Sequence, residues 1–137
     1  MLKMNGSQSP LAVVVDDDAL ILMAACDILT NAGFRCFEAM DHDEAVGVLE
    51  EHHEGVTLLF SDVDLGGGRN GFALARHAAD NWPHIEIVIA SGHVLPQTND
   101  MPAKATFIPK PFGEQTVREH LAAKLPEEKK PGPLKSA

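Results

Sequence analysis

Four apolar runs of this sequence each end in side chains that can take part in chemistry. In chain order they are Leu11–Val15 followed by Asp16-Asp17-Asp18, Val56–Ser61 followed by Asp62, Ile85–Ala90 followed by Ser91, and Ala105–Pro109 followed by Lys110. Carboxylates that gather repel one another and shift toward protonation unless a cation offsets their charge. Oxygen ligands, with no histidine at ligand spacing, favour Mg²⁺ or a similar hard ion.

A hydroxyl and an ammonium beside such a cation suit the oxygens of a phosphoryl group. Lysine binds phosphate as a point charge, and an aspartate can act as a nucleophile toward phosphorus to give an aspartyl phosphate. The metal and the lysine then neutralise charge on the transferring group, while the protein mainly supplies position. This chemistry requires that the four run ends meet in space.

Short strands separated by helices would bring these ends together. Phe34–Glu38 adds a fifth short run, and several of the runs are nearly all apolar, which is typical of strands buried on both faces. Strands that alternate with helices indicate right-handed crossovers and a parallel sheet. The sequence therefore predicts an α/β, flavodoxin-like doubly wound five-stranded parallel sheet, (βα)5, in which ligands bind beyond the carboxyl ends of the strands.

Periodicity and capping residues predict four ordinary helices. They cover Ala19 to Ala32, Asp41 to about Glu51, Gly71 to about Asp80, and Gly113 to about Leu125. Asp18 is interpreted as the cap or first turn of the first helix. Residues 92–104 contain two prolines and little periodicity, so the fourth helix of the fold is expected to be short or distorted.

Composition sets the limits of the domain and of its partners. The formal net charge is −9 and no basic face is evident, so direct nucleic-acid binding is not expected. No apolar run approaches the roughly 20 residues that span a bilayer, and no signal peptide is evident, so a cytoplasmic protein without a membrane partner is expected. We predict a disordered N-terminus over 1–9, one domain over 10–125 and a disordered tail over 126–137.

The two cysteines, Cys26 and Cys36, show no metal-ligand spacing. They are interpreted as reduced and packed side chains. A disulfide or a redox switch is the sharper alternative, and nothing in the sequence favours it.

The motifs VVVDDDAL, LLFSDVDL, IVIASG and FIPKPF contain the residues introduced above. In this order they resemble the receiver domain of two-component response regulators, the CheY-like family. The resemblance covers about Leu11 to Leu125, and it is specific because four motifs occur in the right order. Any one of them alone would be weak.

The resemblance implies a phosphoacceptor and a metal site. Asp62 would be the phosphoacceptor, and Asp17 and Asp62 would ligate Mg²⁺ directly. Asp16 would help through a water molecule, and the backbone carbonyl of Asp64 would be a further ligand.

The resemblance also implies catalytic and switch roles. Ser91 would bond one phosphoryl oxygen and Lys110 would pair with another. Phe107 matches the aromatic position that turns inward when Ser91 moves toward the phosphate. The Lys110–Pro111 bond is commonly cis in this family.

The leading functional hypothesis is a stand-alone receiver in a two-component phosphorelay. A sensor histidine kinase or a histidine phosphotransfer protein would donate the phosphoryl group, and an output protein would read the face formed by the fourth and fifth helices. Only a dozen tail residues follow the domain, so no output domain is expected. Such a domain is not an enzyme on another substrate, because it catalyses only its own phosphorylation and dephosphorylation.

Three alternatives remain open at this point. Asp62-Val63-Asp64 also resembles the Asp-x-Asp signature of haloacid-dehalogenase-like phosphatases, although Asp16-Asp17 lies upstream of it rather than far downstream. A degenerate domain that keeps the fold without phosphorylation would be an interaction module. The chain would also fit a receiver excised from a hybrid histidine kinase.

Overall fold

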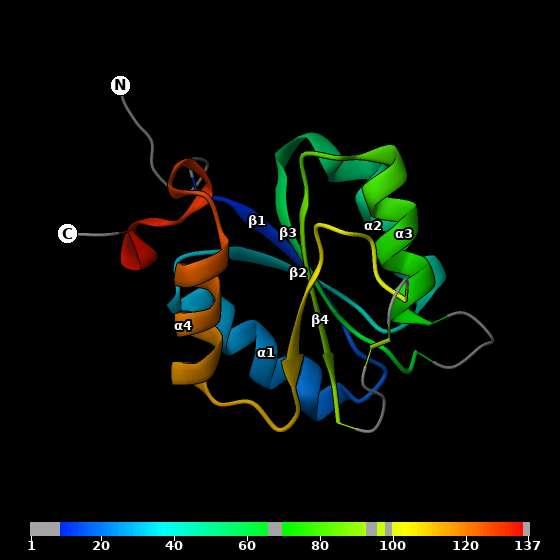
Figure 1. Cartoon of the computed structure of the whole chain (residues 1–137), viewed down its shortest axis with the longest axis horizontal. Coiled ribbons are helices and arrows are strands. Elements are labelled where there is room, and N and C mark those ends of the chain that lie inside the picture. Colours follow the sequence, from blue (N-terminus) through cyan, green and yellow to red (C-terminus); the bar gives the residue numbers. More distant parts are fainter. Residues whose placement is uncertain (1–8, 66–69, 93–95, 98–99, 136–137) are drawn as a thin grey trace.

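The structure is a computed structural model that describes residues 9–65, 70–92, 96–97 and 100–135. One sheet of five strands lies at its centre, in the order β2-β1-β3-β4-β5. The strands are β1 (Leu11–Val15), β2 (Arg35–Ala39), β3 (Val56–Asp62), β4 (Glu86–Ser91) and β5 (Thr106–Pro109). All neighbouring strands pair in parallel, as predicted (Figure 1).

Two pairs of helices cover the two faces of this sheet. The described residues form α1 (Ala19–Asn31), α2 (His42–His52), α3 (Gly71–Asn81) and α4 (Glu114–Lys124), with short 3-10 turns at His53–Gly55, Glu127–Lys129 and Gly132–Leu134. In Figure 1, α1 and α4 lie on one side of the strands and α2 and α3 on the other. This is the predicted doubly wound architecture.

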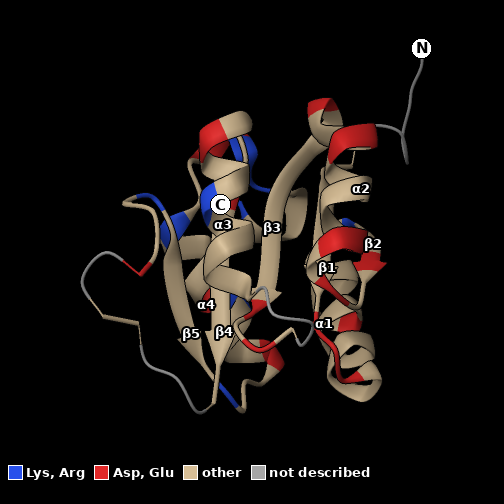
Figure 2. Cartoon of the chain, turned by 90° about the vertical axis from the view of Figure 1, so that its right-hand side faces the viewer, with Lys and Arg blue, Asp and Glu red and all other residues tan. Residues whose placement is uncertain are grey.

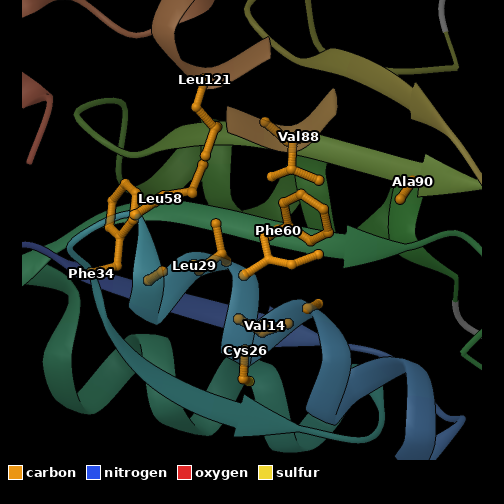
Figure 3. Packing of buried hydrophobic residues seen from close by; sticks show 14 of the residues in the cluster. Val14, Cys26, Leu29, Phe34, Leu58, Phe60, Val88, Ala90 and Leu121 are labelled. Atoms are coloured by element: carbon orange, nitrogen blue, oxygen red, sulfur yellow. The ribbon is translucent and has the colours of Figure 1, made fainter. Parts of the chain in front are cut away.

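The alternation of side chains along buried strands divides the core into two clusters. Ala12 and Val14 of β1 belong to the cluster beneath α1 and α4, while Val13 and Val15 belong to the cluster beneath α2 and α3. All five residues of β1 are buried, because a central parallel strand has a helical layer on both faces. Figure 3 shows part of the first cluster, where Val14, Leu29 and Phe60 lie between α1 and the sheet.

Side-chain caps fix the starts of three helices. The Asp18 carboxylate accepts from the backbone N–H groups of Leu20 and Ile21, at 2.9 and 3.3 Å. Asp41 accepts from the N–H of Glu44 at 2.8 Å, and Asn70 accepts from the N–H of Ala73 at 3.0 Å. These bonds confirm the predicted caps and satisfy N–H groups that have no partner inside the helix.

The expected fourth helix is not found in the described part of residues 92–104. Gly92, residues 96–97 and residues 100–104 adopt turns, bends and irregular backbone. Proline disrupts helical hydrogen bonding, and this segment has two prolines with few strong helix formers between them. The last helix, α4, therefore follows β5 and is the fifth helix of the predicted (βα)5 order.

The expectation of a disordered tail over 126–137 is wrong for residues 126–135. This segment, called here the C-terminal segment, lies beside the start of β1 (Figure 1), and Leu134 is buried in the first core cluster. Pro131 packs over Gly33, where a β-carbon would lie 2.6 Å from the Pro131 β-carbon. Gly33 has a φ of +110° and ends the turn after α1, so a glycine there favours both the backbone conformation and the contact.

Two further predictions concern the N-terminus and contact with a membrane. The predicted disorder over 1–9 falls almost wholly outside the described residues. Within the described part of the chain, no helix is both long and apolar enough to cross a membrane.

Candidate functional site

The carboxyl ends of β1 and β3 carry the acidic residues of the site. Asp16 and Asp17 follow β1 at once, and Asp62 is the last residue of β3. Asp16 and Asp62 are buried, at 4% and 6% exposure, whereas Asp17 is exposed. In Figure 2 the acidic segments after β1 and β3 lie at the same end of the sheet, as adjacent parallel strands require.

Carboxylate oxygens of Asp16, Asp17 and Asp62 lie within 4.8 Å of one another. Within the described part of the chain this is the group of acidic, histidine or cysteine side chains that can hold a metal ion. All its donor atoms are carboxylate oxygens, and the set is open to solvent on the Asp17 side. Such a donor set fits a hard cation that keeps part of its water shell, as Mg²⁺ does.

Lys110 is the cation that the structure places inside this acidic group. It follows β5, and its Nζ lies 2.8 Å from Oδ2 of Asp16 and 2.9 Å from Oδ1 of Asp62. The side chain is only 16% exposed. The backbone N–H of Lys110 also donates to the carbonyl of Ser91 at 2.9 Å, which holds the end of β5 against the end of β4.

The pKa values of Asp62 and Lys110 are both raised, but by different causes. Burial raises the pKa of Asp62, and the nearby Asp16 adds to this, while the hydrogen bond and charge of Lys110 oppose it. For Lys110, burial alone would lower the pKa, but hydrogen bonds to Asp16 and Asp62 and their charges outweigh it and raise the pKa. Lys110 therefore stays charged, and the Asp62 carboxylate is a stronger base than that of an aspartate in water.

A cavity of about 680 Å³ opens over these groups. Its polar floor is formed by Asp16, Asp17, Asp62 and Lys110, and its lining also includes Asp18, Asp64, Gly92, Leu20, Ile21, Ala24, Pro111 and Phe112. The apolar side comes from the first half of α1 and from the segment after Lys110. The cavity thus joins a charged floor to an apolar wall.

The remaining predicted site residues lie around this group. Asp64 is exposed and lines the cavity, although its carboxylate is not part of the acidic group. Ser91 is buried at the end of β4, in register with Pro109 just before Lys110, but it is not among the described residues that line the cavity. Phe107 of β5 is half-buried and packs against the second core cluster, on the far side of the sheet from α1.

Sequence reasoning missed two residues that shape the site. A β-carbon on Gly71 would lie 2.0 Å from the backbone carbonyl oxygen of Asp62, so only glycine allows α3 to start against the end of β3. Phe112 lines the cavity and packs edge-on against Phe60, with ring centroids 5.5 Å apart. The signals were the glycine after the predicted Asn70 cap and the Pro-Phe pair after Lys110. The Lys110–Pro111 bond is cis, as the resemblance implied.

Comparisons with known proteins define the class to which this fold and site belong. A response regulator receiver protein from Sinorhizobium medicae WSM419 superposes with a TM-score of 0.78 at 23% identity, covering 86% of this chain and 95% of that one. The receiver domain of the hybrid histidine kinase CckA gives a TM-score of 0.72 at 27% identity, over 85% and 99% of the two chains. The chain has the CheY-like receiver fold.

The sequence comparisons give the family itself. Residues 12–122 match the family described as response regulator receiver domain, and the chain belongs to that family. It is also 30% identical to the sensor kinase CckA of Brucella abortus (strain 2308), over 84% of this chain but only 13% of that protein. The chain is therefore a receiver domain of two-component signalling, similar to the CckA receiver. Receiver domains are signalling domains that interact with histidine kinases or histidine phosphotransfer proteins.

Proposed function

We propose that this receiver accepts a phosphoryl group on Asp62 from a phosphohistidine donor, in a reaction that depends on Mg²⁺. The observation that supports this most directly is the convergence of Asp16, Asp17, Asp62 and Lys110 at one end of the sheet. The donor would be a sensor histidine kinase or a histidine phosphotransfer protein. A cytoplasmic location is part of this proposal, because such donors present their phosphohistidine there.

The carboxylates would hold the metal ion in a defined way. Asp17 and Asp62 would ligate Mg²⁺ directly, Asp16 would act through a water molecule, and the backbone carbonyl of Asp64 would add a further oxygen. When bound, the ion offsets the negative charge of the phosphoryl oxygens. The other steps belong to side chains of the chain itself.

In the reaction, a carboxylate oxygen of Asp62 attacks phosphorus as the bond from phosphorus to the donor imidazole nitrogen breaks. The electron pair of that bond stays on the imidazole, and the product is an acyl phosphate on Asp62. Lys110 would leave its contact with Asp62 and pair with a phosphoryl oxygen, which preserves the total number of ion pairs. Ser91 would donate its hydroxyl to another phosphoryl oxygen.

Phosphorylation would then shift the population between two conformations. Ser91 ends β4 beside β5, and Phe107 lies on β5, so movement of Ser91 toward the phosphate opens space that the Phe107 ring would fill. The face read by an output protein would be formed by β5, α4 and the segment between β4 and β5. We propose no reaction on a separate substrate, only phosphorylation and dephosphorylation of the domain itself.

The test is phosphorylation by a small phosphodonor in the presence of Mg²⁺. Wild-type protein should gain one phosphoryl group that is released by hydroxylamine, as an acyl phosphate is. Asp62→Asn should gain none, whereas Asp80→Asn, an exposed aspartate on α3, should behave as wild type. Labelling of Asp62→Asn at the wild-type level would overturn the assignment, as would wild-type labelling that is unchanged in EDTA.

A second arrangement is favoured by one comparison. The chain spans 13% of the length of the CckA sensor kinase that it resembles, so a receiver that works beside a kinase in one polypeptide is the alternative context. In that case the donor would act within the same protein. Transfer from a separate phosphorylated phosphotransfer protein, measured with this chain alone, distinguishes the two. The haloacid-dehalogenase-like alternative is set aside, since the chain belongs to the receiver family.

A further inference from the structure

Two cysteines that the proposed function does not use lie on neighbouring elements. Cys26 is on α1, faces the sheet within the first core cluster and is 7% exposed (Figure 3). Cys36 is on β2, at the edge of the sheet, half-buried against the same cluster. Both are free thiols. They are ten residues apart in sequence, but the turn after α1 brings β2 back alongside the helix.

The Cys36 side chain is in direct contact with Cys26. The Cys36 thiol donates to the backbone carbonyl of Cys26, with 3.8 Å between sulfur and oxygen, and the Thr30 hydroxyl donates to Cys36 Sγ at 3.8 Å. The Cys36 sulfur therefore lies against the residue that carries the second thiol. The pKa of each thiol is influenced by the other thiol.

The environments of the two sulfurs give them different roles. Hydrogen bonds from Cys26 and Thr30 lower the pKa of the Cys36 thiol, although burial opposes them. The hydrogen bond to Cys36, followed by burial, raises the pKa of Cys26. Cys36 is also the more exposed of the two. A low-pKa, accessible thiol beside a second thiol is the arrangement that reacts with oxidants and is then resolved as a disulfide.

We propose that hydrogen peroxide converts this pair into an intramolecular disulfide between α1 and β2. The Cys36 thiolate attacks a peroxide oxygen, the O–O bond breaks, and the products are a Cys36 sulfenic acid and hydroxide. The Cys26 sulfur then attacks the Cys36 sulfur and water leaves with the Cys26 proton. In sum, two thiols and one peroxide give one disulfide and two waters. The sequence alone favoured two packed thiols, and the contact between them is what changes that interpretation.

The disulfide would act on the wall of the phosphoacceptor cavity. Leu20, Ile21 and Ala24, all in the first half of α1, line that cavity, and Cys26 follows them on the same helix. A covalent link from Cys26 to β2 would fix the position of this helix relative to the sheet. The proposal itself concerns the bond and does not depend on phosphorylation of Asp62.

The experiment treats the reduced full chain with a small excess of hydrogen peroxide, once folded and once in concentrated urea. The folded wild type should lose two hydrogens by intact mass, resist alkylation and remain monomeric on a non-reducing gel. Disulfide formation should be at least about tenfold faster in the folded chain, because the fold holds the sulfurs together. An equal or slower rate in the folded chain would overturn the proposal, as would two alkylatable thiols after treatment.

Single variants test the two roles. Cys26→Ser should retain peroxide reactivity and trap a sulfenic acid on Cys36, detected with a dimedone probe. Cys36→Ser should give neither the disulfide nor a dimedone adduct at the same peroxide concentration. Circular dichroism verifies that both variants are folded. A dimedone adduct on Cys26 in Cys36→Ser, with none on Cys36 in Cys26→Ser, would contradict the assignment of the attacking sulfur.

Discussion

The two ends of the sheet differ in the sign of their charged side chains and in how those side chains are paired. At the carboxyl end, the described acidic group contains three carboxylates, those of Asp16, Asp17 and Asp62, and Lys110 pairs with two of them, so negative charge is in excess within this group. At the amino end, cationic side chains from the C-terminal segment and from β2 line a second cavity of about 430 Å³: Arg35, Lys129, Lys130 and Lys135. Two of these cations have carboxylate partners: Lys129 with Glu86 at 2.6 Å and Lys130 with Glu127 at 3.1 Å.

This difference indicates that the carboxyl end of the sheet binds a ligand, whereas the charge pairs at the amino end stabilise the fold. Excess charge of one sign in a buried group disfavours the folded state unless a ligand neutralises it, which matches the raised pKa of Asp62. Paired charges on a packed segment instead hold that segment in place. Neutralising a carboxylate should therefore stabilise the protein at the carboxyl end, as with Asp62, and destabilise it at the amino end, as with Glu86. Only neutralising substitutions at the carboxyl end should change phosphorylation.

The largest expected effect is the loss of Lys110, the cation that pairs with Asp16 and Asp62. Lys110→Met leaves Asp16 and Asp62 buried without a counter-charge, so in EDTA at neutral pH we expect a loss of about 3 kcal/mol in the free energy of unfolding. The loss should shrink in acid, because protonated carboxyls no longer repel. Urea unfolding across pH measures it.

Lys124→Met is the matched control for this substitution. Lys124 is exposed at the end of α4, and the same change of charge there should shift stability by about 0.5 kcal/mol or less. If both variants lost the same stability, the effect of Lys110 would come from net charge and not from its place between two carboxylates.

The next effect tests the packing of the C-terminal segment at the other end. Leu134 is 7% exposed in the first core cluster, and Leu134→Ala should lower the free energy of unfolding by about 2 kcal/mol, the low end for a buried leucine because the site lies near a chain end. Phosphorylation by a small donor should be unchanged in the folded variant. A change below about 0.5 kcal/mol would mean that the segment does not pack in solution.

This segment also shows where sequence reasoning fails. Prolines, a glycine and charges predicted disorder over 126–137, because such a composition rarely buries enough apolar surface. The apolar attachment of the segment comes from Pro131 and Leu134. Pro131 fits because Gly33, nearly a hundred residues earlier, has no side chain there. A contact between two distant, individually unremarkable positions leaves no local pattern to detect.

The strands and the acidic residues were predictable for the opposite reason. Each buried strand has its own apolar run, and a parallel sheet places every strand end on one edge, so Asp62 and Lys110 could be brought together by topology alone. The simultaneous pairing of Lys110 with Asp16 and Asp62 and the close approach of Gly71 to Asp62 could not be predicted, since both depend on rotamers and on sub-ångström backbone placement. The segment after β4 is an intermediate case. Its prolines predict a weak helix, but they do not predict the turns and irregular backbone of its described residues.

A smaller effect concerns the ionised form of Asp62. The pKa of Asp62 in the folded protein is raised above its ordinary value of 3.8, so the ionised carboxylate destabilises the folded state. This destabilisation is absent when the pH is below 3.8 and complete when the pH exceeds the raised pKa. In EDTA, Asp62→Asn should therefore be more stable than wild type at neutral pH, by an amount of the order of 1 kcal/mol, and the advantage should vanish in acid.

Adding Mg²⁺ should reverse this order. At ten times its dissociation constant, a ligand of the native state stabilises it by about 1.4 kcal/mol, which wild type should gain and Asp62→Asn should largely lack. Lys129→Gln, at the amino end, should gain as much as wild type. Equal stabilisation of wild type and Asp62→Asn would show that the metal binds without Asp62.

The smallest effect is the pairing of Lys129 with Glu86 at the amino end. The Lys129 side chain is 28% exposed and that of Glu86 19%, and the lysine also donates to the carbonyl of His84 at 2.6 Å. Water still screens part of this pair, so a double-mutant cycle of Lys129→Gln and Glu86→Gln should give a coupling of about 0.5–1 kcal/mol. The two single variants should be less stable than wild type, in contrast to Asp62→Asn in EDTA. A coupling near zero would mean that the apolar contact of Leu134, and not the ion pair, attaches the segment. The two ends would then differ because one depends on charge and the other on packing, and not because one has unpaired and the other paired charges.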